Sequence, residues 1–292
     1  MTTPIQVAFH VGVHSTDEDR LSRSLAQNAD ALRAQGVELC ANAVNEPILN
    51  EALGSLKGGT ASAAMEEVVL DALIEGDSPR RLVMSRPTLL GLPRRVFTID
   101  GLMPFAGTKM LDLANTLPNC RAEFFMALKN PATLIPQLIA RIGKGYEELM
   151  GTTDPRTKRW APTLRQAVQE LRGRRLVVWC HEDMPMIFPE VMRRLAGVEA
   201  DMPLEGEDRL LRRLLTQAGQ AALPERLPPG LSIADRRAAT EALLAEFPRT
   251  EQLALSIDLP GWTPELVAEM TEAYRCDVAE IAALPGIEFI TA

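Results

Sequence analysis

The first twenty residues limit the possible folds of this chain more than any other segment. Apolar residues from Ile5 to Val11 predict a buried strand, Gly12 permits a sharp turn after it, and a helical pattern begins near Arg20. A helix that follows a buried strand directly points unpaired backbone N–H groups at the turn, where nucleotide-binding folds hold phosphate groups. The segment therefore predicts an α/β protein with this turn at its focus.

The side chains of the turn do not suit a phosphate. A phosphate loop needs a lysine and small residues, whereas Ser15 stands at the lysine-like position and Asp17, Glu18 and Asp19 follow it. Two unit charges about 4 Å apart interact by roughly 4 kcal/mol at an effective dielectric near 20, so one inward carboxylate would offset much of the attraction of a helix N-terminus. The turn is therefore predicted to repel anions.

The same acidic residues have a structural interpretation. Ser15 with Glu18, or Thr16 with Asp19, has the spacing of a capping box, and carboxylates in a first turn stabilise a helix through its dipole. We favour this interpretation, in which carboxylates occupy the place of a phosphate. Arg20 could instead pair with a neighbouring acid or reach a bound anion.

Strand and helix patterns alternate through the first 200 residues. Strands are predicted at 5–11, 37–40, 81–85, 121–128 and 176–180, and helices at 21–36, 65–75, 108–117, 131–142, 161–171 and 185–195. The segment from Arg121 to Leu128 is too continuously apolar for a surface strand, which places it centrally in a parallel sheet. This alternation predicts a three-layer αβα core with a central parallel sheet.

The strand pattern fades after Gly197. Amphipathic helices are predicted at 210–218, 233–247 and 264–274, the last with Thr263 as N-cap and Pro264 at its first position. We therefore expect an α/β core at 1–200 and a helical C-terminal extension at 201–292 packed on the same domain.

Composition excludes several classes of protein. The net charge of −8 and the lack of a basic tract argue against a nucleic-acid partner. No run of 18 apolar residues predicts a membrane span, and no secretory leader is visible. The four cysteines form no CxxC pair, so they are expected to be buried free thiols in a cytoplasmic protein.

The segment from His10 to Thr16, followed by a helix carrying Leu21, Leu25 and Asn28, resembles the opening of bacterial sulfotransferase-family proteins. In that family a strand ending in H-x-G leads into x-H-K-T-G-T-T and then into L-x-x-x-L-x-x-N. Three later segments also resemble the family in order and character, namely Arg121–Asn130 with Pro131, Leu176–Asp183 and Tyr274–Ala283. The resemblance implies a P-loop-type fold that binds 3'-phosphoadenosine 5'-phosphosulfate and transfers its sulfonate to a hydroxyl or amine of a small-molecule, glycan or lipid acceptor.

The departures from the family pattern fall on its working residues. Ser15 replaces the loop lysine and Asp17 replaces the loop glycine, while Thr16 is retained. Glu18 and Asp19 replace the two hydroxyl residues that end the motif. Lys129 replaces the arginine that binds the 3'-phosphate, which keeps the charge but loses the two-pronged geometry, and Pro136 replaces a serine. Arg86 and Pro87 stand where relatives often carry a glutamate suited to general-base work.

Several side chains are candidates for a site at this turn. His14 is the candidate for catalysis, because a loop histidine can accept a proton or donate to an anion and its family counterpart is often histidine. The residues expected to contact a cofactor are Gly12, Val13, Ser15, Thr16, Asp17, Arg20 and Lys129. His10 is expected to be a core histidine. His181, Glu182 and Asp183 could join a metal site, although capping of the next helix is favoured.

Three functions compete. In the first, the chain is a diverged sulfotransferase-like protein whose donor site has decayed, leaving a binding or scaffolding role. In the second, it is an active transferase in which Arg20, His14 and Lys129 replace the usual contacts. In the third, the loop acids and His14 hold a divalent cation for hydrolysis, although consecutive helix positions do not easily converge on a metal. We favour the first, and we predict no metal site.

Overall fold

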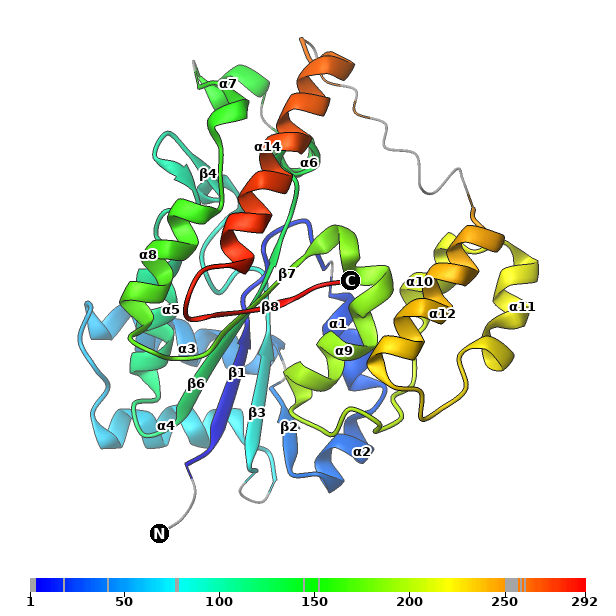
Figure 1. The fold of residues 1–292 in the computed structure, drawn as a ribbon. Coiled ribbons are helices and arrows are strands. Elements are labelled where there is room, and N and C mark those ends of the chain that lie inside the picture. The colour runs from blue at the N-terminus through cyan, green and yellow to red at the C-terminus, as the bar shows by residue number, and fades with distance from the viewer. Residues whose placement is uncertain are drawn as a thin grey trace.

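A computed structural model describes residues 4–17, 19–40, 42–76, 79–143, 145–151, 153–249, 257, 259 and 261–292. Six strands form one sheet in the order β2-β3-β1-β6-β7-β8, and all neighbours are parallel (Figure 1). The strands are β1 (Gln6–His10), β2 (Val37–Leu39), β3 (Arg81–Ser85), β6 (Arg121–Leu128), β7 (Leu176–Cys180) and β8 (Ile287–Ile290). The strand that precedes the turn is therefore central, with β3 on one side and β6 on the other.

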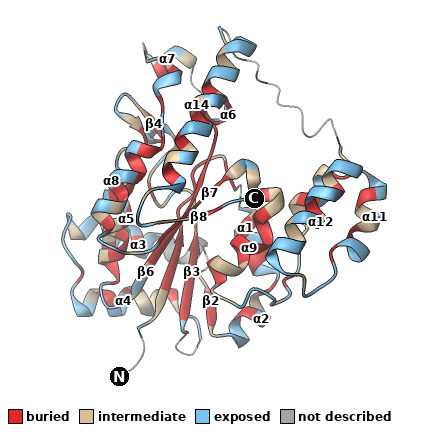
Figure 2. Ribbon diagram, in the orientation of Figure 1, coloured by how far each residue is buried: buried red, intermediate tan, exposed pale blue. Residues whose placement is uncertain are grey.

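The side chains of each central strand divide between two cores. In β6, Phe124, Met126 and Leu128 enter one core, while Phe125 and Ala127 enter the other. Successive side chains of a strand point to opposite faces, so a strand covered on both faces needs apolar residues at every position. Figure 2 shows the result as strands that are buried along most of their length. The continuous apolar run of 121–128 therefore marked a central strand, as predicted.

Helices cover both faces of the sheet, which confirms the three-layer αβα architecture. One face carries α3 (Asn42–Leu56), α4 (Ala63–Leu73), α5 (Ala106–Thr116), α6 (Pro131–Ile142), α8 (Ala161–Leu171) and α14 (Pro264–Ala282). The other carries α1 (Arg20–Ala26), α2 (Ala29–Ala34) and α9 (Met184–Ala196). Gly197 ends α9 with a φ of 63°, and a Cβ there would lie 2.7 Å from Cδ of Arg81. Only glycine fits this left-handed position beside the buried arginine.

Three helices form a unit beside α9, at the side of the molecule shown in yellow and orange in Figure 1. These are α10 (Arg209–Leu214), α11 (Gln217–Arg226) and α12 (Ile233–Glu246), and we call residues 209–248 the helical unit. Its small core consists of Leu211, Leu215, Leu223, Leu227 and Leu243. The predicted helix 210–218 is wrong, because Leu215 leaves the helical path to pair with Pro248 in an isolated bridge.

The chain returns to the α/β core after the helical unit. Thr263 caps α14 as predicted, since its hydroxyl accepts a hydrogen bond from the Leu266 N–H at 3.2 Å. The helix then runs to Ala282, beyond the predicted end at 274, and β8 joins the sheet beside β7. The segment 201–292 therefore contains a strand and a core helix in addition to the helical unit.

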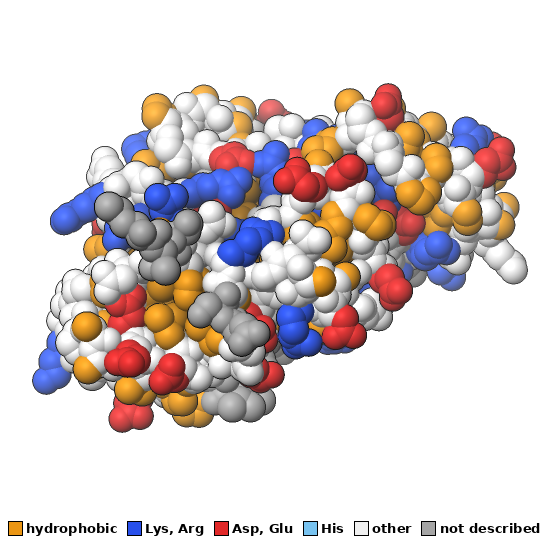
Figure 3. Space-filling view, turned by 90° about the horizontal axis from the view of Figure 1, so that it is seen from below, with side chains coloured by type: hydrophobic (Ala, Val, Ile, Leu, Met, Phe, Trp, Pro, Cys, Tyr) orange, Lys and Arg blue, Asp and Glu red, His pale blue; other side chains and the backbone are white. Residues whose placement is uncertain are grey.

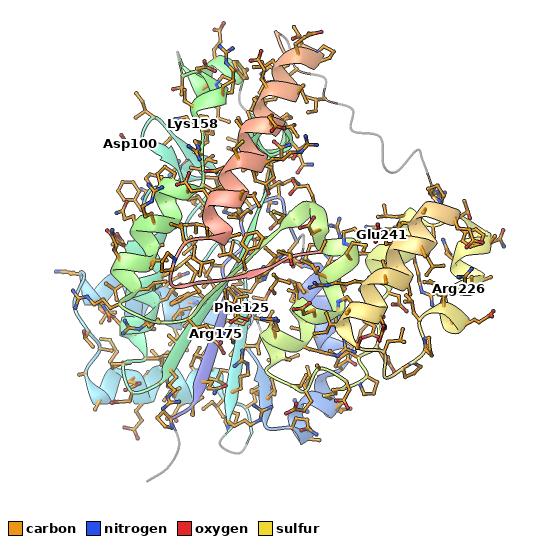
Figure 4. The ribbon with its side chains drawn as sticks, in the orientation of Figure 1. Asp100, Phe125, Lys158, Arg175, Arg226 and Glu241 are labelled. Carbon is orange, nitrogen blue, oxygen red and sulfur yellow. The ribbon has the colours of Figure 1, made fainter. Side chains whose placement is uncertain are left out.

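Shorter elements surround the carboxyl ends of the strands. They are η1 (Pro93–Arg95), the hairpin of β4 (Phe97–Thr98) and β5 (Gly101–Leu102), α7 (Tyr146–Met150), η2 (Pro155–Thr157) and η3 (His181–Asp183). Lys158 points at the hairpin that carries Asp100 (Figure 4), and its ammonium donates to the carbonyl oxygens of Thr98 at 2.7 Å and Ile99 at 3.0 Å. Within the described part of the chain, no helix is long and apolar enough to cross a membrane.

Candidate functional site

The turn after β1 stays paired with β6 beyond the end of the strand. The Val11 N–H donates to Phe125 O at 2.9 Å, the Ala127 N–H donates to Gly12 O at 2.7 Å, and the Val13 N–H donates to Ala127 O at 3.4 Å. A phosphate loop binds its anion through free backbone N–H groups. Here the N–H groups of Val11 and Val13 already have carbonyl partners, so these two donors are not available to an anion.

Gly12 is required by the close approach of a neighbouring segment. Its φ is +98°, and a Cβ at this position would lie 3.1 Å from Cα of Pro87. Residue 86 is held there because the Arg86 N–H donates to His10 O at 2.9 Å. The glycine therefore lets the segment after β3 pack on the turn, which is a structural role.

The Asp17 side chain hydrogen-bonds to the first turn of α1. Its Oδ1 accepts a hydrogen bond from the Leu21 N–H at 2.9 Å in the first turn of α1, and the residue is 8% exposed. The predicted pair of Thr16 and Asp19 is wrong as a cap, because the Thr16 hydroxyl donates to Val13 O and Asp19 makes no side-chain cap. Glu18, the partner predicted for Ser15, lies outside the described residues. The helix N-terminus is thus satisfied by a carboxylate of the protein itself.

The environment of Asp17 disfavours its charge. Burial raises the pKa of this carboxyl to about 6, although the Leu21 N–H and the positive charge of Arg20 act in the opposite direction. At neutral pH the group is still mainly ionised, so a second anion at the same place would meet a negative charge.

Lys129 reaches into the turn from the end of β6. Its ammonium donates to Ser15 O at 2.6 Å and to Oε1 of Gln137 at 2.6 Å, and the side chain is buried. The indole N–H of Trp160 donates to Lys129 O at 2.9 Å, which fixes the backbone at the same point. The lysine that resembles a 3'-phosphate ligand is therefore used to hold the turn.

His10 at the end of β1 and His14 in the turn are both buried. His14 is 1% exposed, and its Nε2 lies 2.8 Å from Gly91 O. Its Nδ1 has no hydrogen-bond partner among the described residues, and burial lowers the pKa of this imidazole. His10 is a core residue as predicted: its Nδ1 lies 2.7 Å from Ser85 Oγ, and its ring stacks on Trp179. The candidate base His14 is therefore closed off from solvent.

Residues 181–183 follow β7 and face α14. The Glu182 carboxylate accepts hydrogen bonds from the Asn130 N–H at 2.9 Å and from the Tyr274 hydroxyl at 3.1 Å. The Asn130 amide also donates to Oγ1 of Thr271 at 2.9 Å. Glu182 thus ties the ends of β6 and β7 to α14, a role that the sequence did not reveal because Asn130 and Tyr274 are 144 residues apart (274 − 130).

Positive charges gather between the turn and β7. Burial, together with the nearby charges of Lys129 and Arg20, lowers the pKa of His181 to about 3. Burial and the charge of Glu182 raise the pKa of Asp183. No group of three or more potential metal-binding side chains occurs among the residues that the structure describes. The turn, Lys129, Arg20 and His181 are therefore brought together, but the two best-placed charges, on Asp17 and Lys129, already have partners within the protein.

No protein-family model matches this chain, and no curated protein sequence matches it.

Proposed function

We propose that this chain is a sulfotransferase-like α/β protein whose donor-nucleotide site is degenerate, so that it acts by binding rather than by sulfonate transfer. One observation supports the proposal: the Asp17 Oδ1 accepts a hydrogen bond from the Leu21 N–H at 2.9 Å in the first turn of α1, where the resemblance implies a bound phosphate. The resemblance to the sulfotransferase family and the P-loop character of the turn are part of this proposal. So is a cytoplasmic location.

The electrostatic balance of the turn supports a lost donor site. An anion placed about 4 Å from an ionised Asp17 would be repelled by roughly 4 kcal/mol at an effective dielectric near 20. The Lys129 ammonium could offset this only by leaving Ser15 O and Gln137 Oε1, both at 2.6 Å. Breaking these bonds would cost the buried Lys129 ammonium two hydrogen bonds.

A restored turn tests the proposal. The variant Ser15→Lys, Asp17→Gly, Glu18→Thr and Asp19→Thr supplies the lysine and the small and hydroxyl residues of a phosphate loop. We expect the unfolding midpoint of this variant to rise with millimolar 3'-phosphoadenosine 5'-phosphate, while that of the wild type does not change. Ligand at a hundred times its dissociation constant would add about 2.7 kcal/mol to the free energy of unfolding.

A charge-matched variant separates the shape of the turn from its net charge. Asp30→Asn, Glu67→Gln, Asp71→Asn and Glu225→Gln change exposed acids elsewhere and raise the net charge by the same amount, four units. The unfolding midpoint of this control variant should not change when the nucleotide is added. A midpoint rise in the wild type would show an active donor site and refute the proposal. If the nucleotide does not raise the unfolding midpoint of the restored-turn variant either, the inferred relationship of this turn to phosphate loops is refuted.

A further inference from the structure

A cavity of about 960 Å³ lies between α9 and the helical unit. Its apolar lining comes from both sides, with Met186 and Pro189 on α9 and with Leu227, Leu231 and Ile233 at the turn that leads into α12. Figure 3 shows the helical unit at the right-hand end of the molecule, with apolar side chains interspersed among charges. The volume lies within the range of roughly 300–1,000 Å³ that is typical of sites for small organic ligands.

The charged side chains that line the cavity carry an excess of positive charge. Six are arginines, two from each of α9, α10 and α12, and five are acids. Two of the carboxylates each bridge a pair of arginines, namely Glu190 between Arg194 and Arg237 and Glu207 between Arg193 and Arg236. One negative charge on a ligand would therefore neutralise the lining.

The two arginines of α10 have no acid as a partner. Within the described part of the chain, neither Arg209 nor Arg212 forms an ion pair, and the Arg209 guanidinium donates to the amide oxygen of Gln27 at 2.8 Å. Residues three apart on a helix lie on the same side of it, so both guanidinium groups can reach one ligand. They can bind an anion without giving up a carboxylate of the protein.

Arg237 has fewer acceptors than a guanidinium can use. Its Nη2 donates to Glu190 at 2.6 Å, whereas its Nε is buried and has no hydrogen-bond partner among the described residues. Its side chain is 25% exposed, while the lining acids Asp201 and Glu205 are exposed residues. Solvent and salt screen exposed charges more strongly than partly buried ones. The field inside the cavity therefore favours an anion.

We propose that this cavity binds a small organic carboxylate with an apolar body. The carboxylate would accept hydrogen bonds from Arg209 and Arg212, because the planar guanidinium group matches the geometry of a carboxylate. The apolar body would contact Met186, Leu231 and Ile233. This proposal is independent of the donor site, because the cavity includes no residue of the turn 11–19.

Three ligands that share one alkyl chain test the charge of the head group. At pH 7.5 octanoate is negative, octanol is neutral and octylammonium is positive. In calorimetric titrations of the full chain, we expect octanoate to bind saturably at one site and at least tenfold more tightly than the other two. Equal or tighter binding of octanol or octylammonium would overturn the anionic class. Absence of saturable octanoate binding up to millimolar concentration would overturn the site.

A double variant tests the place of the head group. Arg209→Gln with Arg212→Gln removes both guanidinium groups and should weaken octanoate binding at least tenfold. Arg172→Gln with Arg213→Gln is the matched control, because it removes the same charge from two exposed arginines that do not line the cavity, and it should not change binding. Equal weakening by the two double variants would overturn the assignment of the head group to α10.

A cavity-filling variant tests the place of the apolar body. Ile233→Trp puts a large side chain in the cavity at a residue that is 40% exposed, and it should weaken octanoate binding at least tenfold. Val68→Trp is the matched control on α4, where Val68 is 62% exposed and does not line the cavity. Pro229→Trp replaces the first variant if circular dichroism shows that it does not fold. Equal octanoate binding by a folded cavity-filling variant and the wild type would overturn the site.

Discussion

At the scale of single residues, Asp17 combines a favourable hydrogen bond with an unfavourable burial. Its pKa is raised to about 6 from 3.8, so the folded state holds a proton more tightly than the unfolded state does. The contribution of this group to stability is therefore greatest below pH 4 and is lost as the pH rises to about 6. Two pKa units correspond to a free-energy loss of about 3 kcal/mol.

Asp17→Asn keeps an acceptor for the Leu21 N–H and removes the charge. We expect the free energy of unfolding of this variant, relative to the wild type, to increase between pH 4 and pH 7 by up to about 3 kcal/mol. Urea denaturation at a series of pH values measures this difference. Asp30→Asn, at an exposed acid, is the control and should show no such trend. A difference that does not vary with pH would contradict the burial of an ionised Asp17.

The buried histidines should give the free energy of unfolding the opposite dependence on pH. Burial lowers the pKa of His10 to about 4 and that of His181 to about 3, and it lowers the pKa of His14 as well. The unfolded chain takes up these protons near pH 6.5, before the folded chain does, so stability falls as the pH drops from 6.5 towards 4. His10→Gln should make the decrease in the free energy of unfolding between pH 6.5 and pH 4 smaller by about 3 kcal/mol, as measured by urea denaturation. If the variant loses as much stability as the wild type between pH 6.5 and pH 4, His10 has an ordinary pKa in the folded protein.

The chemical character of the turn could be predicted from the sequence, but its contacts could not. Three consecutive acids after Thr16 indicate repulsion of anions whatever their rotamers. The bond from Lys129 to Ser15 joins residues 114 positions apart, and nothing local in either segment signals it. Likewise, the spacing suggested Ser15 with Glu18 or Thr16 with Asp19 as the capping pair, whereas Asp17 is the side chain that reaches the Leu21 N–H, and Asp19 has a left-handed φ of 62°.

At the scale of elements, α14 is fastened to the sheet through Tyr274. Its hydroxyl donates to Glu182 Oε2 at 3.1 Å, and the ring is 7% exposed. Tyr274→Phe keeps the ring and removes the donor, so it should lower the free energy of unfolding by about 1 kcal/mol. Tyr146→Phe is the matched control, because the structure describes no hydrogen bond from the Tyr146 hydroxyl. Equal stability of the two variants in thermal denaturation would contradict this account of α14.

Strands with two buried faces were the most predictable elements. The boundaries of β3, β6 and β7 match the prediction because every position except Arg121 and Ala122 at the start of β6 is buried. The predicted helix 21–36 is instead two helices, α1 and α2, because Asn28 Nδ2 donates to Ser24 O at 2.8 Å and to Glu205 O at 3.1 Å. The strand β8 was missed, because it has only four residues, three of them half-buried, lies at the sheet edge and shows no clear alternation.

At the scale of the whole molecule, the two cores that flank the sheet are much larger than the core of the helical unit. The α/β core has a continuous sheet with buried helices on both faces, whereas the core of the helical unit consists of five buried leucines. Local stability follows the amount of buried apolar contact. The helical unit is therefore expected to open more readily than the sheet.

Hydrogen exchange measures this difference. Amides of residues 209–248 should exchange faster in the native state than those of β1 and β6, by at least an order of magnitude in protection. Equal protection in both parts would show that the molecule unfolds as one cooperative unit.

The most direct measurement is a calorimetric titration of 3'-phosphoadenosine 5'-phosphate into the wild-type protein at pH 7.5 and low salt. The account predicts no saturable heat up to millimolar nucleotide, because Asp17 and Lys129 already satisfy the turn. Saturable binding with a micromolar dissociation constant that is lost on replacing Lys129 with methionine would contradict it.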